Sequence, residues 1–251
     1  MSDSTLAGRT IVVTGAARGL GRAFAETLGR RGARVWIADV LEEGRATAAS
    51  LRAEGVDAEF ARVDLRDEAS VAELAATVTA RGPVYGLVNN AARADGVGGK
   101  RIDEITPAEW DDVMSVNVRG TWLVSRAFVP GMIASGEGRI VNLGSDAALF
   151  GSSRLAHYIT SKGAVAALTR AMATDLGPFG VCVNTVSPGL TETEAAANIP
   201  AARHELYRSN RSLDRVQQPS DVTGLVGFLM SPEASYITGQ QVVVNGGFVF
   251  H

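Results

Sequence analysis

The sequence predicts an α/β fold, a single domain in which seven parallel strands form a doubly wound sheet with helices on both faces. Short apolar runs alternate with longer helical ones along the chain, which is typical of parallel strands joined by right-handed helical crossovers. The chain has 251 residues, 46% of them hydrophobic and 20% charged, enough for one sizeable core. Glycines fall where strands pass into helices, as tight strand-to-helix turns require.

The elements of the first half alternate regularly. The run Thr10–Thr14 is apolar on both sides, as expected for a strand covered on both faces. A helix from about Gly19 to Arg31 follows, with Gly32 as a left-handed stop. The next elements are a strand over Arg34–Ala38, a helix through Ala46 to Ala53, a strand over Ala58–Val63, an amphipathic helix over Glu68–Ala80 and a strand over Val84–Val88.

The second half begins with a strongly marked helix. Thr106 is a capping residue, Pro107 fits the first helical position and Glu109 completes a capping box, so we predict a helix from there to about Ile133. Three more strands follow, with helices between them: Arg139–Leu143, Val181–Val186 and Gln241–Val244. We expect residues 1–251 to form one domain, in which 191–218 is an inserted excursion that covers the substrate.

Charge and composition exclude several classes of protein. The 24 Lys and Arg residues against 27 Asp and Glu give a net charge of −3, which leaves no basic excess for nucleic acid. Cys182 is the only cysteine, so no internal disulfide can form. The first ten residues resemble no secretory signal, and no apolar run is long enough to span a bilayer. We therefore expect a cytoplasmic protein with no membrane or nucleic-acid partner.

A dinucleotide site is predicted at the first strand-to-helix turn. Gly15, Gly19 and Gly21 let the backbone approach a pyrophosphate, while the helix N-terminus offers free N–H groups and a positive dipole end. Asp39 follows the second strand, 18 residues after Gly21, where a carboxylate can accept hydrogen bonds from the ribose diol and repel a 2′-phosphate. We therefore expect a Rossmann-type site that prefers NAD. Asp39 as a helix cap is the alternative, and Arg18 is expected to face solvent or pack along the adenosine.

A catalytic set follows from helical spacing. Tyr158 and Lys162 are four residues apart and so lie on one helix face. The lysine ammonium and an oxidised nicotinamide should both favour the phenolate, so that Tyr158 takes a proton from an alcohol while hydride leaves the carbon. Ser145 follows a predicted strand, at the sheet edge where ligands bind, and its hydroxyl can donate to the substrate oxygen.

Taken together, the motifs resemble the short-chain dehydrogenase/reductase family over essentially the whole chain. The resemblance rests on Thr14-Gly15, Gly19-Leu20-Gly21, Asp64-Leu65, Asn89-Asn90-Ala91-Ala92, Asn117, Ser145, the run Tyr158 to Lys162, Pro188-Gly189 and the run Ile237 to Gly239. It implies that Asp64 and Leu65 flank the adenine, that Asn89 and Ala91, with Asn90, line the cofactor trough, and that Pro188, Gly189 and Thr193, with Thr191, hold the nicotinamide carboxamide. It also implies that Asn117 shapes its helix and holds a water in a proton relay with Lys162, and that Leu20 joins the cofactor set.

The predicted function is hydride transfer between NAD and a small neutral secondary alcohol or ketone, with an aryl or cyclic body. Segments 92–97, 146–155 and 190–207 should wall the substrate pocket, and their run Ala147 to Phe150 is apolar. Three alternatives stay open: an NADPH-dependent 3-oxoacyl-carrier reductase, a pyridoxal or sugar dehydrogenase, and a dinucleotide sensor without catalysis. The three scattered histidines, among them His157, predict no metal site.

A symmetric homo-oligomer, a tetramer, is also expected. The helix from Pro107 carries Trp110, Val113 and Trp122, and the C-terminal segment Gly246 to His251 contains two phenylalanines. In a monomer such side chains would form exposed apolar patches, which usually mark contacts. The alternative is that the tail folds back on its own subunit.

Overall fold

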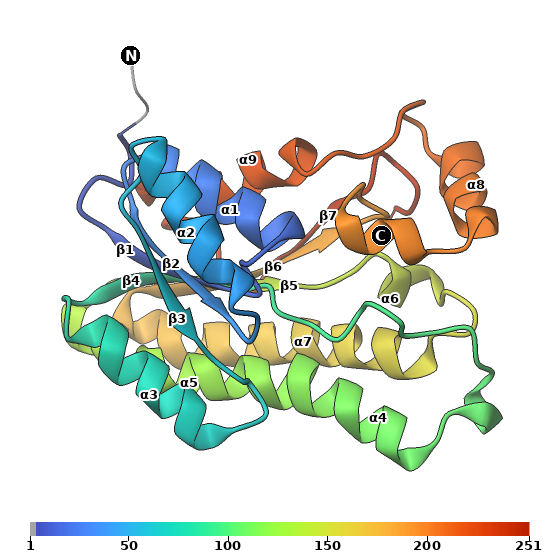
Figure 1. Ribbon diagram of the computed structural model, residues 1–251, viewed down its shortest axis with the longest axis horizontal. Helices are drawn as coiled ribbons and strands as arrows, with labels where there is room; N and C mark the ends of the chain where they lie inside the picture. The colour runs from blue at the N-terminus through green and yellow to red at the C-terminus, as the bar shows by residue number, and fades with distance from the viewer. Residues whose placement is uncertain (1–3, 251) are drawn as a thin grey trace.

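The computed structural model describes residues 4–250 and is built on one sheet of seven parallel strands, in the order β3-β2-β1-β4-β5-β6-β7 (Figure 1). This confirms the predicted fold class. The strands are β1 (Thr10–Thr14), β2 (Arg34–Asp39), β3 (Ala58–Arg62), β4 (Val84–Asn89), β5 (Gly138–Leu143), β6 (Val181–Pro188) and β7 (Gln241–Val244). Most lie within two residues of their predicted bounds.

Helices cover both faces of the sheet (Figure 1). One layer contains α1 (Gly19–Arg30), α2 (Glu43–Ala53) and α9 (Ser220–Leu229), and the other contains α3 (Glu68–Thr79), α4 (Pro107–Met114), α5 (Thr121–Ser135) and α7 (Ala156–Leu176). Two apolar cores result, one on each side of the sheet. Phe24 and Leu28 of α1 are buried in the first, and Phe128 and Met132 of α5 in the second. Because both faces are covered, the central strands are buried along their whole length and mostly apolar.

The helix predicted from Pro107 to Ile133 is interrupted. Residues 115–120 form a π-helical turn between α4 and α5, and α5 then continues to Ser135. Gly120 at the end of this turn packs so tightly on Leu65 that a Cβ atom there would lie 2.8 Å from the leucine Cβ. Turns of this kind are frequent at functional sites, and this one contains Asn117.

The topology places the functional residues. The chain runs from β1 outward to β3, then returns to β4 and continues outward to β7, so its direction reverses between β1 and β4. Ligands of such sheets bind at this switch point, beyond the carboxyl ends of the strands. The short helices α6 (Ala147–Phe150) and α8 (Ala201–Asn210) lie beyond this same edge (Figure 1). None of the helices formed by the described residues is long and apolar enough to cross a membrane.

Candidate active site

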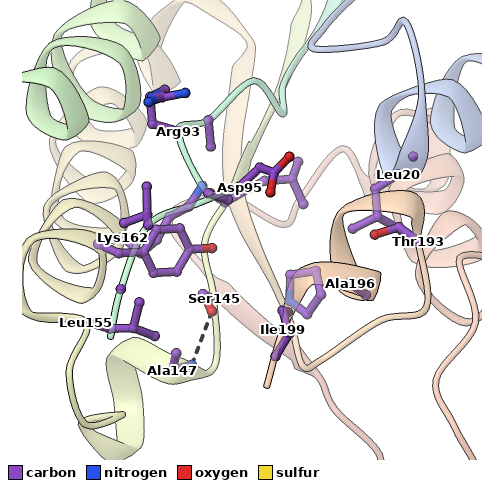
Figure 2. Close-up of a pocket in the computed structure, with 18 of the residues that line it drawn as sticks. Leu20, Arg93, Asp95, Ser145, Ala147, Leu155, Lys162, Thr193, Ala196 and Ile199 are labelled. Carbon is purple, nitrogen blue, oxygen red and sulfur yellow. Dashed lines mark hydrogen bonds between the residues drawn. The ribbon is translucent and has the colours of Figure 1, made fainter. Parts of the chain in front are cut away.

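A cavity of about 1320 Å³ opens at the carboxyl edge of the sheet. Its walls include the loops that follow β1 to β6, together with parts of α7 and α8. Figure 2 shows Leu20 and Thr193 on one side of this cavity, with Ser145, Leu155 and Lys162 on the other. The three segments expected to wall a substrate pocket all contribute residues to it. We refer to it below as the strand-end cavity.

The glycine-rich turn forms one end of the cavity. Gly15 and Gly19 have φ values of +63° and +60°, a conformation that side-chain-bearing residues rarely adopt. A Cβ atom on Gly21 would lie 2.1 Å from the Gly15 carbonyl oxygen, so only glycine fits there. The cap residue of α1, Arg18, makes no capping hydrogen bond with its side chain. The first N–H groups of α1 are therefore available to an anion, which fits the pyrophosphate of a dinucleotide.

Asp39 lies at the end of β2 and lines the cavity, although it is only 8% exposed. Its carboxylate accepts hydrogen bonds from the backbone N–H groups of Ala17, at 2.9 Å, and Leu41, at 3.0 Å. The capping alternative is thus observed in part, since Leu41 precedes α2. An ionised carboxylate has about four acceptor positions, so these two bonds leave acceptor positions for a ribose hydroxyl.

The other cofactor candidates divide into two groups. Those that line the cavity are Gly15, Arg18, Gly19, Leu20, Gly21, Asp39, Asp64, Leu65, Asn90, Ala91, Tyr158, Lys162, Pro188, Gly189, Thr191 and Thr193. Asn89 does not: its amide is buried and donates to Ser125 and Asn142, between the sheet and α5. The expectation that Asn89 lines the trough is therefore wrong, because adjacent residues at a strand end point to opposite faces.

The guanidinium of Arg66 is paired with the carboxylate of Asp64. Its Nε and Nη2 atoms lie 3.0 and 2.8 Å from the two carboxylate oxygens. This paired hydrogen bond holds the pKa of Asp64 below its ordinary value. Asp64 thus presents an acceptor that is already engaged, while the neighbouring Leu65 offers the cavity a buried apolar surface.

Ser145, Tyr158 and Lys162 all line the cavity. Ser145 follows β5, and its Oγ accepts the N–H of Ala147 at 3.2 Å, the dashed line in Figure 2. The Lys162 ammonium donates to the carbonyl of Leu143 at 2.7 Å and lies 5.8 Å from the centre of the Tyr158 ring. Burial lowers the pKa of Lys162 to about 8. The side chain therefore remains mostly protonated at pH 7.

The surroundings of Tyr158 shift the pKa of its phenol. Burial raises the pKa of this phenol above its ordinary value, and the charge of Asp146 raises it further, whereas a hydrogen bond with Ser145 opposes the rise. Lys162 is not among the groups that lower it here. The prediction that Lys162 and an oxidised nicotinamide together favour the phenolate therefore stays a prediction, and in this structure the Lys162 ammonium donates to the Leu143 carbonyl.

Asn117 lies behind the cavity wall rather than in it. It is buried in the π-helical turn, where its Oδ1 accepts the N–H of Arg93 at 2.7 Å and its Nδ2 donates to Ser161 at 3.0 Å. Ser161 in turn donates to the carbonyl of Tyr158. Asn117 therefore connects the loop after β4 with the helix that carries Tyr158, and makes no direct hydrogen bond to Lys162.

Sequence reasoning assigned no role to a second group of cavity residues. Asp146, Arg203 and Tyr207 line the cavity within the segments expected to wall it, although none of them was given a role. The Tyr207 hydroxyl donates to Asp146 at 2.6 Å, and Arg203 donates to the carbonyl of Ser153. The position of Asp146 directly after Ser145 was the one feature of the sequence that indicated a place near the site. Its contact with Tyr207 could not be predicted, because the two residues are 61 positions apart in the sequence.

His157 and Cys182 do not line the cavity. His157 is buried in α7, and Cys182 is buried in β6, with its thiol near the carbonyl of Ser235. Within residues 4–250, no three His, Cys, Asp or Glu side chains are grouped so that they could hold a metal ion.

Comparison with known proteins gives consistent results. The sequence model of a family described as enoyl-(acyl carrier protein) reductase matches residues 15–249. The chain is 38% identical to sorbitol dehydrogenase of Cereibacter sphaeroides over 256 residues, which covers 96% of this chain and 98% of that protein. It is 36% identical to cyclopentanol dehydrogenase of Comamonas testosteroni, over 96% of each chain.

The fold is also shared with solved structures. One is a putative NAD(P)-dependent gluconate 5-dehydrogenase from Beutenbergia cavernae, solved with NADP bound at low occupancy. It is 36% identical to this chain, covers 98% of both chains and superposes with a TM-score of 0.91. Sequence, fold and cavity agree, and the chain belongs to the short-chain dehydrogenase/reductase family of oxidoreductases.

Proposed function

We propose that this protein is an NAD-dependent dehydrogenase that interconverts a small secondary alcohol and its ketone. The observation that carries the proposal is that Ser145, Tyr158 and Lys162 line the same cavity as an uncapped, glycine-rich helix N-terminus. The helix N-terminus alone would indicate that a dinucleotide binds. A group that can donate and accept a proton beside that site indicates a catalysed reaction. Members of the family bind a nicotinamide dinucleotide, and the relatives named above are dehydrogenases.

The residues of this chain have separable roles in that reaction. The dinucleotide supplies the hydride acceptor. In our proposal the N–H groups of α1 bind its phosphates, and the ribose diol is bound by the carboxylate of Asp39. Ser145 donates a hydrogen bond to the substrate oxygen and so orients it toward Tyr158. Tyr158 accepts the hydroxyl proton during oxidation and returns it during reduction.

Lys162 acts through Tyr158. Its buried ammonium lies 5.8 Å from the phenol ring, and positive charge near a phenol favours the phenolate. Since burial raises the pKa of Tyr158 in the structure, that charge is needed to bring the phenol into a useful range. Asn117 fixes the geometry of the helix that carries Tyr158 and Lys162. We also propose for Asn117 the role in a water relay that the family resemblance implies.

The preference for NAD rests on Asp39. Its charge at the end of β2 repels a 2′-phosphate, although a related structure contains NADP. The same carboxylate argues against the NADPH-dependent 3-oxoacyl-carrier reductase. Apolar side chains at the cavity end near α6 and α8, among them Phe150, Leu155 and Leu206, favour an aryl or cyclic alcohol body. Segment 191–218, which contributes Leu206, is proposed as the cover of that body.

We also propose a homotetramer. Trp122 on α5 is 45% exposed and Phe250 near the C-terminus is 82% exposed, large apolar areas of the kind that mark contacts. The tail alternative is observed in part, because Phe248 stacks on Tyr207 of its own chain at 4.3 Å.

The test is reduction of NAD or NADP, followed at the nicotinamide absorbance, with cyclopentanol, 1-phenylethanol, sorbitol and pyridoxine. We expect turnover with NAD and at least one cyclic or aryl alcohol. Faster turnover with NADP would refute the cofactor assignment, and turnover with sorbitol or pyridoxine alone would identify a different dehydrogenase. Tight NADH binding without turnover of any alcohol or of the corresponding ketones would indicate a sensor instead.

A further inference from the structure

A carboxylate is buried immediately beside Ser145. Asp146 has no exposed surface at all, and its Oδ1 accepts the Tyr207 hydroxyl at 2.6 Å. Its second oxygen faces the turn at Gly189, where a Cβ atom would lie 3.0 Å from it. The backbone N–H of Asp146 donates to the carbonyl of Pro188. Asp146 therefore joins the loop after β5, which carries Ser145, to the loop after β6 and to α8.

Tyr207 is the anchor of α8. Within this helix, which the structure describes in full, Tyr207 is the only buried residue. Its ring stacks on Phe248 at 4.3 Å, meets Phe150 edge-on at 6.2 Å and is covered by the Arg211 guanidinium at 5.0 Å. The other residues of α8 are exposed or half-buried, and Arg203 donates to the carbonyl of Ser153. The helix contributes Ala202, Arg203 and Leu206 to the cavity wall.

The charge of Asp146 is disfavoured where it lies. Burial raises the pKa of this carboxyl to about 6, while hydrogen bonds with Tyr207 and Asn245 and the charge of Arg211 hold it down. Tyr158 on α7 faces the same charge, which raises the pKa of that phenol. A buried carboxyl with a raised pKa, in a cavity beside a proposed catalytic group, is a candidate functional residue.

We propose that Asp146 and Tyr207 are positioning residues, whose hydrogen bond holds α8 over the substrate part of the cavity in register with Ser145. The pair therefore sets the KM for the alcohol more than the affinity for the dinucleotide. This inference deepens the proposed function, and its kinetic readout rests on that function.

The first test removes the hydrogen bond and keeps the aromatic ring. Tyr207→Phe should raise the KM for the best alcohol of the panel about 10-fold, as expected when a buried hydrogen bond to a charged group is lost. The kcat should change less, and the Kd for NADH, measured by fluorescence titration, should stay within about 2-fold. Tyr236→Phe is the matched control, because Tyr236 is fully exposed and does not line the cavity, and it should leave all three values unchanged.

The second test separates geometry from charge. Asp146→Asn retains an oxygen that can accept the Tyr207 hydroxyl, so its KM should stay closer to that of the wild type than the KM of Asp146→Leu. It also removes the charge that raises the Tyr158 pKa, so half-maximal alcohol oxidation should move to lower pH. Asp175→Asn, at the exposed end of α7, should cause no such shift. An Asp146→Asn variant with an unmoved pH profile and a KM as high as that of Asp146→Leu would refute the role of Asp146.

The third readout does not depend on activity. Backbone amides of α8 should exchange hydrogen faster in Tyr207→Phe than in the wild type and in Tyr236→Phe. A raised KM without faster exchange would overturn the positioning role, and faster exchange with an unchanged KM would overturn the link to substrate. If the wild type oxidises no alcohol, the proposed function fails. In that case, unchanged amide exchange of α8 in Tyr207→Phe would also refute the role of Tyr207 as the anchor of α8.

Discussion

The buried carboxylate of Asp146 should leave a measurable signature in stability. The pKa of this group is raised from 3.8 to about 6 in the folded protein, a shift of about 2 units at roughly 1.36 kcal/mol per unit. In the window between these values the folded protein binds more protons than the unfolded chain. Ionisation of Asp146 therefore destabilises the fold by about 3 kcal/mol, fully at pH values above about 6 and not at all well below 4.

The assay compares the wild type with Asp146→Asn by urea unfolding at pH 4.5, 5.5, 6.5 and 7.5, at one protein concentration. The variant has no titrating group at this position, so the difference between the two unfolding free energies isolates Asp146. Linkage predicts that this difference moves in favour of the variant by about 2 kcal/mol between pH 4.5 and 7.5. The amide of the Asp146→Asn variant could form poorer hydrogen bonds than the carboxylate does. That would add a constant to the difference in unfolding free energy at every pH and would not change how the difference varies with pH. A pH-independent difference would show that Asp146 is not a perturbed buried carboxyl.

Four further predictions concern the site and the assembly. Asp39→Ser should reduce the preference for NAD over NADP, measured as the ratio of kcat/KM values, by about 1.5–3 kcal/mol, and an unchanged ratio would disprove the assignment. Tyr158→Phe should lower kcat by roughly 10²–10⁴-fold with NADH binding almost intact, and near-normal turnover would contradict its role. Gly21→Ala should weaken NADH binding at least about 10-fold through overpacking against the Gly15 carbonyl, whereas Gly224→Ala, which has open space in α9, should bind normally. Light scattering on dilute, active protein should give four times 26.2 kDa; an active particle of 26.2 kDa would exclude the tetramer as a requirement.

Local patterns predicted the fold and much of the cavity wall. The five inner strands, β1, β2, β4, β5 and β6, are buried almost throughout, so their apolar runs can be recognised without knowledge of their neighbours. The glycine turn could be predicted because its backbone conformation depends on the glycines themselves. Asp39 could be predicted because it directly follows a recognisable strand. Tyr158 and Lys162 share a helix face, and their spacing alone places them together.

What the sequence did not predict depends on distant contacts. Whether Asn89 or Asn90 faces the cavity is decided by the last residues of β4, where a shift of one position reverses the direction. The π-helical turn around Asn117 ends at Gly120, which packs closely on Leu65 from another part of the chain. The Asp146–Tyr207 bond joins two segments that no local pattern relates.

The most direct measurement follows the hydride itself. Cyclopentanol or 1-phenylethanol, deuterated at the carbinol carbon, is incubated with enzyme and NAD, and the reduced cofactor is examined by mass spectrometry. The proposed function predicts one deuterium in each NADH formed, a matching amount of ketone, and loss of both products in Tyr158→Phe under conditions where that variant still binds NADH. Formation of ketone without deuterium in NADH, or unchanged deuterium transfer by the Tyr158→Phe variant, would contradict it.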